Sequence, residues 1–490
     1  MKAKTLVLGL TVAAMLQTAA QDFSTTVFDG PEVPAVNTAP SHRIPALVQL
    51  SDGRLLAVAD HRYGLSDVGG RQARIELWYS HSADGGRTWT VPDTVCPAST
   101  SPTTWKYAMG DAALVADRES SEVLLYCACG TVGMGNSTAA QPIRIALFRS
   151  HDNGATWDDG TEVTQQVYAL FGGDATAIFI TSGRLCQSRC VKVGTHYRVY
   201  AAFPVRTISR GNSTGVMYSD DFGQSWQLLG MAETFAEGTV YEEGKIEEMP
   251  DGSVALMVRD DRGTQGVDYA EKNFNHFRYT DVEQGLGEWG RAQSAITGMA
   301  NACNSAFILV PARRVADGAK CCVMLTTVPF HTVYARNATD NWGRRGVGFY
   351  YKEVTSQADY NSGEALAIGW LCGHQVTQLC SAYADMLLLD DGYVALLLED
   401  NGTQGRSADG NNETECYDIV YRHLSLSTIT EGAYEVDMTY DPYVCYLGVS
   451  APQPSVGLPL SCLRYDLLGR ALCYHLPGIV VEKGLKRIVR

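Results

Sequence analysis

The sequence predicts an all-β fold, specifically a six-bladed β-propeller with a short C-terminal β extension. Three observations lead to this prediction: an eight-residue pattern recurs at regular spacing, 48 of the 490 residues are glycine, and helical periodicity is nearly absent. Glycine at this frequency, without a collagen period, is typical of many tight turns between short strands. A closed propeller also accommodates several hundred residues in one architecture.

The recurring pattern is S-x-D-x-G-x-[ST]-W, with copies that begin at Ser82, Ser150 and Ser219. These start positions are 68 and 69 residues apart, a spacing that suits one four-stranded blade with its loops. In each copy the Asp can accept backbone N–H groups, the Gly supplies a positive φ and the Trp packs under the turn. A degenerate copy is expected at 279–289, and residues 25–430 leave room for six units. We interpret the copies as structural hairpin turns.

The first twenty residues have the pattern of an export signal. A basic start is followed by a largely apolar run at 6–16, and small residues at 18–20 precede Gln21. The apolar run is too short to span a membrane, and no other stretch of about 18 apolar residues follows. We therefore expect a signal peptide at 1–20, a propeller at 21–437 and a β-rich tail at 438–490. The protein is expected to be exported, to the periplasm, the cell surface or the medium.

The C-terminal tail contains the elements YDLxGR and PGI…GxKR. It resembles the tails of proteins exported by Bacteroidetes-type bacteria, where such segments can direct secretion and surface attachment. A plain β extension that packs on the propeller is the alternative, and the sequence leaves both open.

Charge and cysteine usage limit the ligands that the protein can bind. The formal charge is −15, from 39 basic and 54 acidic residues, which argues against nucleic acid as a partner. A site for an anionic ligand must therefore concentrate positive charge locally. No CxxC pair among the 14 cysteines has zinc-site spacing, so we expect no metal site. Most of these cysteines are expected to be small buried hydrophobes, with one or two disulfides left open.

Six separated motifs carry the residues suited to chemistry. They are SHRIP at 41–45, RYGLSDV at 62–68, EEGKIEE at 242–248, RDDRG at 259–263, GRRGVGFYY at 343–351 and SAYADM at 381–386. Together with the recurring pattern, they resemble the bacterial sialidase (neuraminidase) family over residues 40–425. Two departures are His42, where the family has Tyr or Phe, and a segment at 330–342 that is longer than the family norm.

The resemblance implies that Arg43, Arg259 and Arg344 grip the carboxylate of sialic acid, with Arg345 as a competitor for the third position. A planar guanidinium offers a carboxylate two parallel N–H donors and keeps its charge. Further residues are implied around this triad: Arg62 near the carboxylate and the C4 hydroxyl, Asp111 near that hydroxyl although the usual adjacent Pro is missing, and Glu399 as the group that holds Arg43.

The resemblance also assigns the reacting groups. Tyr383 is implied to be the nucleophile, Glu243 the base that deprotonates it, and Asp67 the acid/base on a glycine-rich loop. A neutral phenol suits this substrate because the anomeric carbon of sialic acid carries a carboxylate, which would repel an attacking Asp or Glu. A phenol with a pKa near 10 needs a base beside it.

The implied activity is that of a retaining exo-α-sialidase, which hydrolyses terminal sialic acids from sialylated glycans through a covalent sialyl-tyrosine and needs no cofactor. Two alternatives remain at this point. The same site could transfer the sugar or release an anhydro-sialic acid, or the chain could be a non-catalytic sialic-acid-binding propeller. Retention of Tyr383, Glu243 and Asp67 argues against the binding protein, because a lectin needs only the arginines.

Overall fold

A computed structural model describes most of the chain. The described residues are 21–30, 41–64, 66–70, 74–230, 241–260, 272–295, 299, 303–330, 344–406, 413–443, 478–482 and 485–489. The expected signal peptide at 1–20 lies outside them. The chain divides into two compact units, Met1–Cys445 and Tyr446–Arg490. The predicted boundary at 437/438 stays a prediction.

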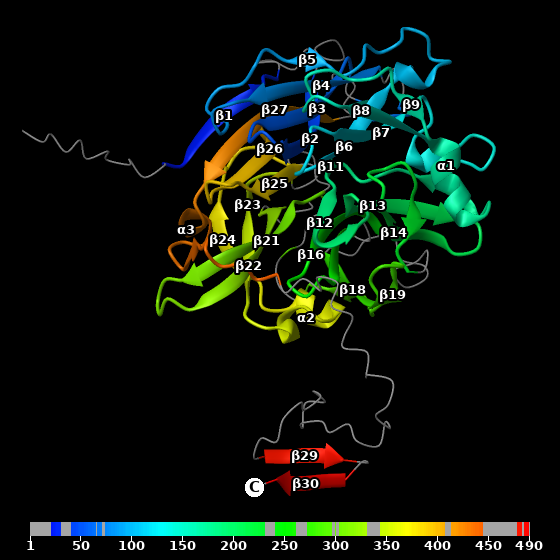
Figure 1. The fold of residues 1–490 in the computed structure, drawn as a ribbon. Helices are drawn as coiled ribbons and strands as arrows, with labels where there is room; N and C mark the ends of the chain where they lie inside the picture. The colour runs from blue at the N-terminus through cyan, green and yellow to red at the C-terminus, as the bar shows by residue number, and fades with distance from the viewer. Residues whose placement is uncertain are drawn as a thin grey trace, which may run out of the picture. The chain divides into compact units, whose positions relative to one another are not determined.

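The described part of the first unit consists of largely antiparallel sheets with three short α-helices, which confirms the all-β prediction (Figure 1). The largest sheet has the order β25-β26-β27-β2-β3-β4-β5, and β1 pairs with β27. One residue pair, His42 with Tyr417, joins its two halves. The strands of this sheet are β1 (Phe23–Phe28), β2 (Ser41–Gln49), β3 (Leu55–Arg62), β4 (Ile75–Ser82), β5 (Asp93–Thr94), β25 (Ala384–Leu388), β26 (Val394–Arg406) and β27 (Glu413–Leu424).

Four five-stranded sheets complete the first unit, with orders β11-β6-β7-β8-β9, β10-β13-β14-β15 with β12, β16-β17-β18-β19 with β20, and β24-β23-β22-β21-β28. The strands of the first two are β6 (Met109–Ala116), β7 (Val123–Cys129), β8 (Arg144–Ser150), β9 (Thr161–Glu162), β10 (Ala175–Ile178), β11 (Gly183–Arg184), β12 (Cys186–Val193), β13 (His196–Thr207), β14 (Gly211–Ser219) and β15 (Gln227–Leu228). Those of the other two are β16 (Tyr241–Glu248), β17 (Val254–Asp260), β18 (Asn273–Asp281), β19 (Leu286–Trp289), β20 (Gln293–Ser294), β21 (Phe307–Arg314), β22 (Lys320–Pro329), β23 (Val347–Val354), β24 (Leu371–Gln375) and β28 (Tyr434–Val436).

The helices of this unit are α1 (Thr164–Tyr168), α2 (Gly363–Ala367) and α3 (Leu426–Ile429), with short 3₁₀ turns between strands. No helix in the described ranges has the length and apolar character needed to cross a bilayer. In the second unit, β29 (Gly478–Glu482) and β30 (Leu485–Val489) pair as an antiparallel hairpin.

Neighbouring sheets contact one another in chain order, and within the largest sheet β25 also contacts β2. The inner strands β2, β11, β16, β21 and β25 therefore surround a common centre, as Figure 1 shows. The core lies between adjacent sheets. One buried cluster joins β6–β8 to β13 and β14, and another joins β21–β23 to β25–β27. This burial of apolar surface between sheets fixes their mutual positions, which in turn positions the side chains at the centre.

The recurring motif forms the expected turn. In the second copy, Asp152 accepts hydrogen bonds from the Thr156 amide at 2.8 Å and from its hydroxyl at 2.6 Å. The Gly154 amide donates to the Ser150 hydroxyl at 2.8 Å. The glycine of the pattern has φ between 74° and 92° in the three copies, at Gly86, Gly154 and Gly223. A Cβ on Gly154 would meet Leu56 of the preceding sheet at 2.9 Å, so the turn also packs against its neighbour.

The degenerate copy at 279–289 makes the same kind of contact. Gly285 has φ 67°, and a Cβ there would lie 2.3 Å from the hydroxyl of Tyr218 in the preceding sheet. The indole of Trp289 donates to the carbonyl of Leu229 at 2.7 Å. This turn therefore packs against the preceding sheet as the complete copies do, although its sequence matches the pattern only in part.

The hydrogen bonds of these turns predict acid-sensitive stability. Burial opposes ionisation of Asp152, but the hydrogen bonds from Thr156 and Ser150 outweigh it, so the pKa of Asp152 lies below its ordinary value. A lowered pKa stabilises the fold above the unfolded pKa, and this stabilisation is lost as the pH falls through the folded pKa. We expect Asp152→Ala to lower the free energy of unfolding by about 1.5 kcal/mol at neutral pH and by less near pH 3.

Denaturant titration at the two pH values measures this effect, and Asp159→Ala is the matched control because Asp159 is an exposed carboxylate beside the turn. Equal destabilisation by both substitutions would contradict a structural role of Asp152 in the turn.

Nine cysteines in the described part of the chain are free thiols: Cys96, Cys127, Cys129, Cys186, Cys303, Cys321, Cys322, Cys372 and Cys380. Cys127 and Cys129 lie in one buried cluster, as their spacing predicts, whereas the adjacent Cys321 and Cys322 point into different clusters. Most of the described cysteines are therefore small buried hydrophobic residues, whereas Cys372 is exposed.

Candidate active site

The centre of the first unit brings together residues from strands that are far apart in the sequence. Tyr383 directly precedes β25, and its backbone pairs with Glu399 of β26 through a Glu399 amide that donates to the Tyr383 carbonyl at 2.9 Å. Glu243 lies in β16 beside the β17 residue Arg259, because Gly244 pairs with Val258 in that ladder. Two hairpins of neighbouring strands therefore present these four side chains to one region.

Tyr383, Glu243 and Arg259 form one hydrogen-bonded group. The Tyr383 hydroxyl donates to Glu243 Oε2 at 3.0 Å, and Arg259 Nη1 donates to the same hydroxyl at 2.8 Å. Arg259 Nη1 also pairs with Glu243 Oε2 at 2.7 Å and lies 3.4 Å from Glu242 Oε2. Tyr383 and Glu243 are buried, with 7% and 5% of their surfaces exposed.

Burial raises the pKa of Tyr383 well above its ordinary value, and the neighbouring Glu243 carboxylate raises it further, although Arg259 and Arg344 oppose this. The phenol is therefore neutral in the ligand-free site and remains hydrogen-bonded to a carboxylate that can accept its proton. A hydroxyl paired with a base in this way is the arrangement of an activated nucleophile.

Glu399 holds both Arg43 and the strand of Tyr383. Its Oε1 accepts from Arg43 Nε at 2.6 Å and from the Ile44 amide at 2.8 Å, while Oε2 accepts from the Tyr383 amide at 3.1 Å. Glu399 is fully buried, and Ile44 has φ 58°, a strained value for a β-branched residue. The Ile44–Glu399 hydrogen bond helps to hold this strained turn, which aims Arg43 at the centre.

Arg43 and Arg344 both lie over the Tyr383 ring, with guanidinium carbons 5.6 Å and 5.3 Å from its centroid. Arg345 instead contacts the Cys380 thiol at 3.7 Å. The sequence left the choice between Arg344 and Arg345 open, and the geometry places Arg344 beside the other site residues. Three guanidiniums thus converge on Tyr383, from Arg43, Arg259 and Arg344.

Arg62 carries a second charged group at the same centre. It is buried and pairs with Asp60 Oδ2 at 2.8 Å through Nη2, while its Nη1 donates to Asp67. Asp60 also accepts from the Asp111 amide at 3.0 Å, and Asp111 has φ 60°. These contacts tie the loop that carries Asp67 and the start of β6 to β3.

The three carboxyls of this group differ in their pKa values. The Arg62 guanidinium lowers the pKa of Asp67 to about 2, with Arg43 and Arg344 acting in the same direction. Burial raises the pKa of Asp111 and of Asp60 above the ordinary range, and each is raised further by nearby carboxylates. Asp67 has a side chain that is 76% exposed, so of the three it is the one that meets a ligand from solvent.

The sequence prediction missed two residues of this site. Asp60 is two residues before Arg62 in β3, so both side chains lie on one face of the strand, and that spacing is the signal that could have found it. Tyr417 lies under Arg43, with its ring centroid 5.3 Å from the guanidinium carbon. It has no local sequence signal, because only the pairing of β27 with β2 brings it there.

A family model described as a BNR repeat-like domain matches residues 53–275. A sialidase of Bacteroides fragilis (strain YCH46) is 30% identical over 242 residues, which cover 45% of this chain and 40% of that protein. A sialidase of Micromonospora viridifaciens is 29% identical over 229 residues, covering 45% of this chain and 33% of that protein. The matches thus span less than half of these curated relatives.

A solved structure of the intramolecular trans-sialidase from Ruminococcus gnavus, in complex with oseltamivir carboxylate, has the same fold. Its TM-score is 0.59 at 18% identity, and the match covers 83% of this chain and 98% of that one.

Proposed function

Because this chain belongs to the bacterial sialidase family, we propose that it is a retaining exo-α-sialidase that removes terminal sialic acids from sialylated glycans. The observation that carries the proposal is the hydrogen-bonded group of Tyr383, Glu243 and Arg259 beneath two further guanidiniums. A sialic-acid-binding protein needs the arginines but not a buried tyrosine paired with a carboxylate.

In the proposed first step, Arg43, Arg259 and Arg344 bind the carboxylate of the sugar through charge-assisted hydrogen bonds. The Tyr383 oxygen attacks the anomeric carbon while its proton passes to Glu243. The bond from that carbon to the glycosidic oxygen breaks, and Asp67 gives a proton to the departing oxygen. In the second step, water attacks the anomeric carbon and loses a proton to Asp67. Tyr383 then leaves and takes its proton back from Glu243, which restores the site and releases sialic acid.

A general acid must carry a proton before the reaction, whereas the ligand-free site holds Asp67 ionised. In the ligand-free site its pKa is about 2, because of Arg62 and, more weakly, Arg43 and Arg344. A bound carboxylate neutralises part of that positive charge, so substrate binding raises the pKa of Asp67 toward the range that a general acid needs.

We also propose that the first unit is a six-bladed propeller. The support is that its four five-stranded sheets and the two halves of its largest sheet, which share only the His42–Tyr417 pair, amount to six sheets around the centre. Export remains part of the proposal and rests on the signal pattern of residues 1–20.

The direct test of the function is incubation of the mature chain with 3′-sialyllactose, followed by mass spectrometry of the products. Free sialic acid together with lactose is the expected result. Anhydro-sialic acid as the main product would show that the enzyme catalyses intramolecular transfer and not hydrolysis. That is the reaction for which the Ruminococcus gnavus protein is named. Absence of any product would contradict the catalytic proposal.

Glu399→Gln tests the group that holds Arg43. We expect kcat/KM for 3′-sialyllactose to fall about 10- to 100-fold, because the charge-assisted bond to Arg43 at 2.6 Å is weakened. Asp400→Asn is the matched control. Asp400 is the buried carboxylate next to Glu399, and the substitution weakens its 2.7 Å ion pair with Arg422, which lies away from the proposed substrate. Both variants are expected to lower the melting temperature. A similar loss of kcat/KM in both would assign Glu399 a structural role alone.

A further inference from the structure

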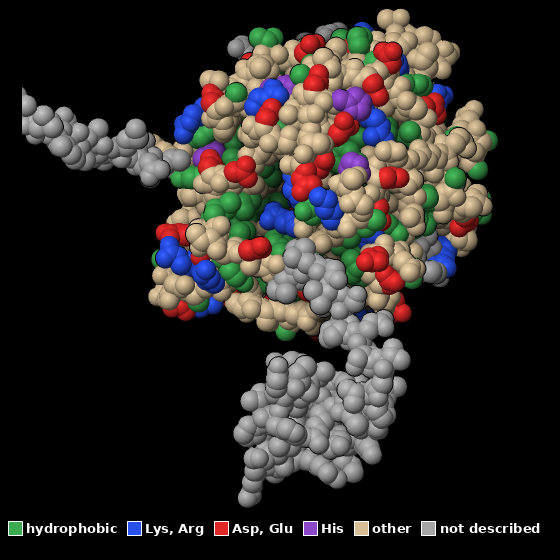
Figure 2. Space-filling view, in the orientation of Figure 1, with side chains coloured by type: hydrophobic (Ala, Val, Ile, Leu, Met, Phe, Trp, Pro, Cys, Tyr) green, Lys and Arg blue, Asp and Glu red, His purple; other side chains and the backbone are tan. Residues whose placement is uncertain are grey.

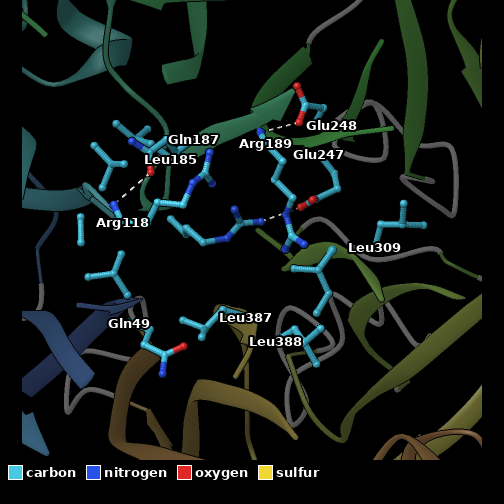
Figure 3. Close-up of a pocket in the computed structure, with 15 residues that line it drawn as sticks. Gln49, Arg118, Leu185, Gln187, Arg189, Glu247, Glu248, Leu309, Leu387 and Leu388 are labelled. Carbon is cyan, nitrogen blue, oxygen red and sulfur yellow. Dashed lines mark hydrogen bonds and ion pairs between the residues drawn. The ribbon is translucent and has the colours of Figure 1, made fainter. Parts of the chain in front are cut away.

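Three layers of side chains follow one another along β16 and along β25 with the residue before it. Residues two apart in a strand share a face, so every second side chain points the same way. From the active site toward the other ends of the strands, the layers are Glu243 with Tyr383, Lys245 with Asp385, and Glu247 with Leu387. Figure 3 shows Glu247 and Leu387, which line a cavity at those ends. The middle layer therefore lies between the active site and this cavity, and none of the proposed catalytic steps uses it.

The proposed base and nucleophile are carried by strands of different sheets. β16 lies in the sheet β16-β17-β18-β19, whereas β25 is the first strand of the largest sheet. In the described sheets no backbone ladder joins the two strands, yet Glu243 Oε2 and Tyr383 Oη are 3.0 Å apart. Figure 2 shows a hollow near the positions of β11 and β12, with basic and acidic side chains gathered around it. The distance between base and nucleophile must therefore be maintained by side chains.

The middle layer connects β16 and β25 to two further inner strands. Lys245 and Asp385 are buried, with 6% and 2% of their surfaces exposed. Lys245 Nζ donates to the carbonyl of Ser182, directly before β11, and Asp385 Oδ2 accepts from the Leu47 amide of β2 at 3.0 Å. A Cβ on Gly183 would collide with Lys245 Nζ and would lie 3.1 Å from the carboxyl carbon of Asp385. The two charged groups therefore meet at the same point of β11, where a glycine leaves room for them.

Each charge of the middle layer favours the ionised form of the other. Burial lowers the pKa of Lys245, and the Asp385 carboxylate opposes this, as does Glu243. Burial raises the pKa of Asp385, and of the groups that oppose this the Lys245 ammonium is the strongest. Arg184, a second cation near Asp385, is paired with Glu247 in the next layer at 2.7 Å. Opposite charges attract strongly in a buried site, and removal of one leaves the other uncompensated.

We propose that Lys245 and Asp385 are positioning residues that hold β16 and β25 at the separation at which Glu243 reaches the Tyr383 hydroxyl. This inference rests on the proposed function, because it concerns the proposed base and nucleophile. The pair acts through Glu243 and Tyr383, each of which lies two residues before one of its members in the chain. The substrate carboxylate is bound by other groups, so the pair affects the chemical step more than binding.

Lys245→Met and Asp385→Asn test the proposal in steady-state hydrolysis of a 4-methylumbelliferyl α-sialoside. In each variant we expect kcat to fall about 10- to 100-fold, because a small displacement of base or nucleophile is costly. KM should stay within about threefold, since Arg43 is held by Glu399 and not by this pair. A purely structural role would not separate kcat from KM in this way.

The double variant Lys245→Met/Asp385→Asn removes both charges and leaves no lone buried ion. Its loss of kcat should resemble that of one single variant and should be at least about tenfold smaller than the product of the two single losses. If a single variant does not fold, the double variant decides, because wild-type kcat in it would overturn the proposal.

The matched control is Lys352→Met. Lys352 of β23 is also a buried lysine whose Nζ donates to backbone carbonyls, those of Asp359 at 2.7 Å and of Ala365. This variant should lower the melting temperature as Lys245→Met does, but kcat should stay within about twofold. A comparable fall of kcat in Lys352→Met would reduce the effect of Lys245 to stability and refute the proposal.

Two further outcomes would refute it. Single variants with wild-type kcat would show that the pair does not position the reacting groups. A raised KM with unchanged kcat would instead assign the pair to substrate binding. Failure of the proposed function is distinguished by the wild-type protein: an inactive wild type contradicts both proposals, whereas an active wild type with unaffected variants contradicts this one alone.

Discussion

Tyr383→Phe is expected to lower kcat for a 4-methylumbelliferyl α-sialoside by about 10³-fold or more while the protein stays folded. The substitution removes one oxygen, the atom that accepts from Arg259 at 2.8 Å and donates to Glu243 at 3.0 Å. Without it, the anomeric carbon has no enzyme nucleophile. The ring remains, so its contacts with Arg43 and Arg344 persist and the variant should still bind sialic acid.

Tyr417→Phe is the matched control for this prediction. Tyr417 belongs to the same buried cluster as Tyr383 and lies under Arg43. The hydrogen bonds described above for Glu243 and Arg259 involve Tyr383 and not Tyr417. It should retain kcat within about tenfold. Steady-state fluorescence release measures both variants, and calorimetry with free sialic acid checks binding. Comparable activity in Tyr383→Phe and wild type would eliminate Tyr383 as the nucleophile.

Asp67→Asn is expected to have effects that depend on the leaving group. For 3′-sialyllactose, whose departing alkoxide needs a proton, kcat/KM should fall about 10²- to 10⁴-fold. For the 4-methylumbelliferyl sialoside, whose phenolate leaves without one, the loss should be at least about tenfold smaller. The structural basis is the position of Asp67, which is exposed to solvent and in contact with buried Arg62.

The two substrates serve as internal controls for each other, because misfolding lowers both rates by the same factor. Rates are measured across pH to separate protonation from binding. Equal losses on both substrates would assign Asp67 to binding of the sugar. The general acid would then be another group, and half-buried Asp111 is the nearest choice because its pKa is raised.

The local features of the fold could be predicted from the sequence because they depend on neighbouring residues. The turns at Ser82, Ser150 and Ser219 are determined by eight residues each, and in each of them the Asp accepts a backbone N–H as expected. The nine proposed site residues came from the family resemblance, and the structure brings their strands to one centre. Their roles remain predictions, as does the number of blades.

The features that the sequence could not predict are those that depend on contacts between strands far apart in the chain. The choice of Arg344 over Arg345 follows from which residue lies over Tyr383, and that requires β23 and β25 to be placed. The strained φ of Ile44 follows from the irregular pairing of β2 with β3. A cavity at the ends of β2, β11, β16, β21 and β25 is lined by residues of five sheets, and these residues have no common motif.

The pairing of β1 with β27 has a consequence for how the protein reaches its native state. Phe23 of β1 pairs with His423 of β27, so a strand that is synthesised late is completed by one that is synthesised early. At a synthesis rate of about 5–20 residues per second, roughly 20–80 s pass before both partners exist. Closing a contact of that sequence separation is also slow. Until then the early sheets can form, but β27 lacks its β1 partner. The nascent chain is therefore without its final cooperative stability during this interval.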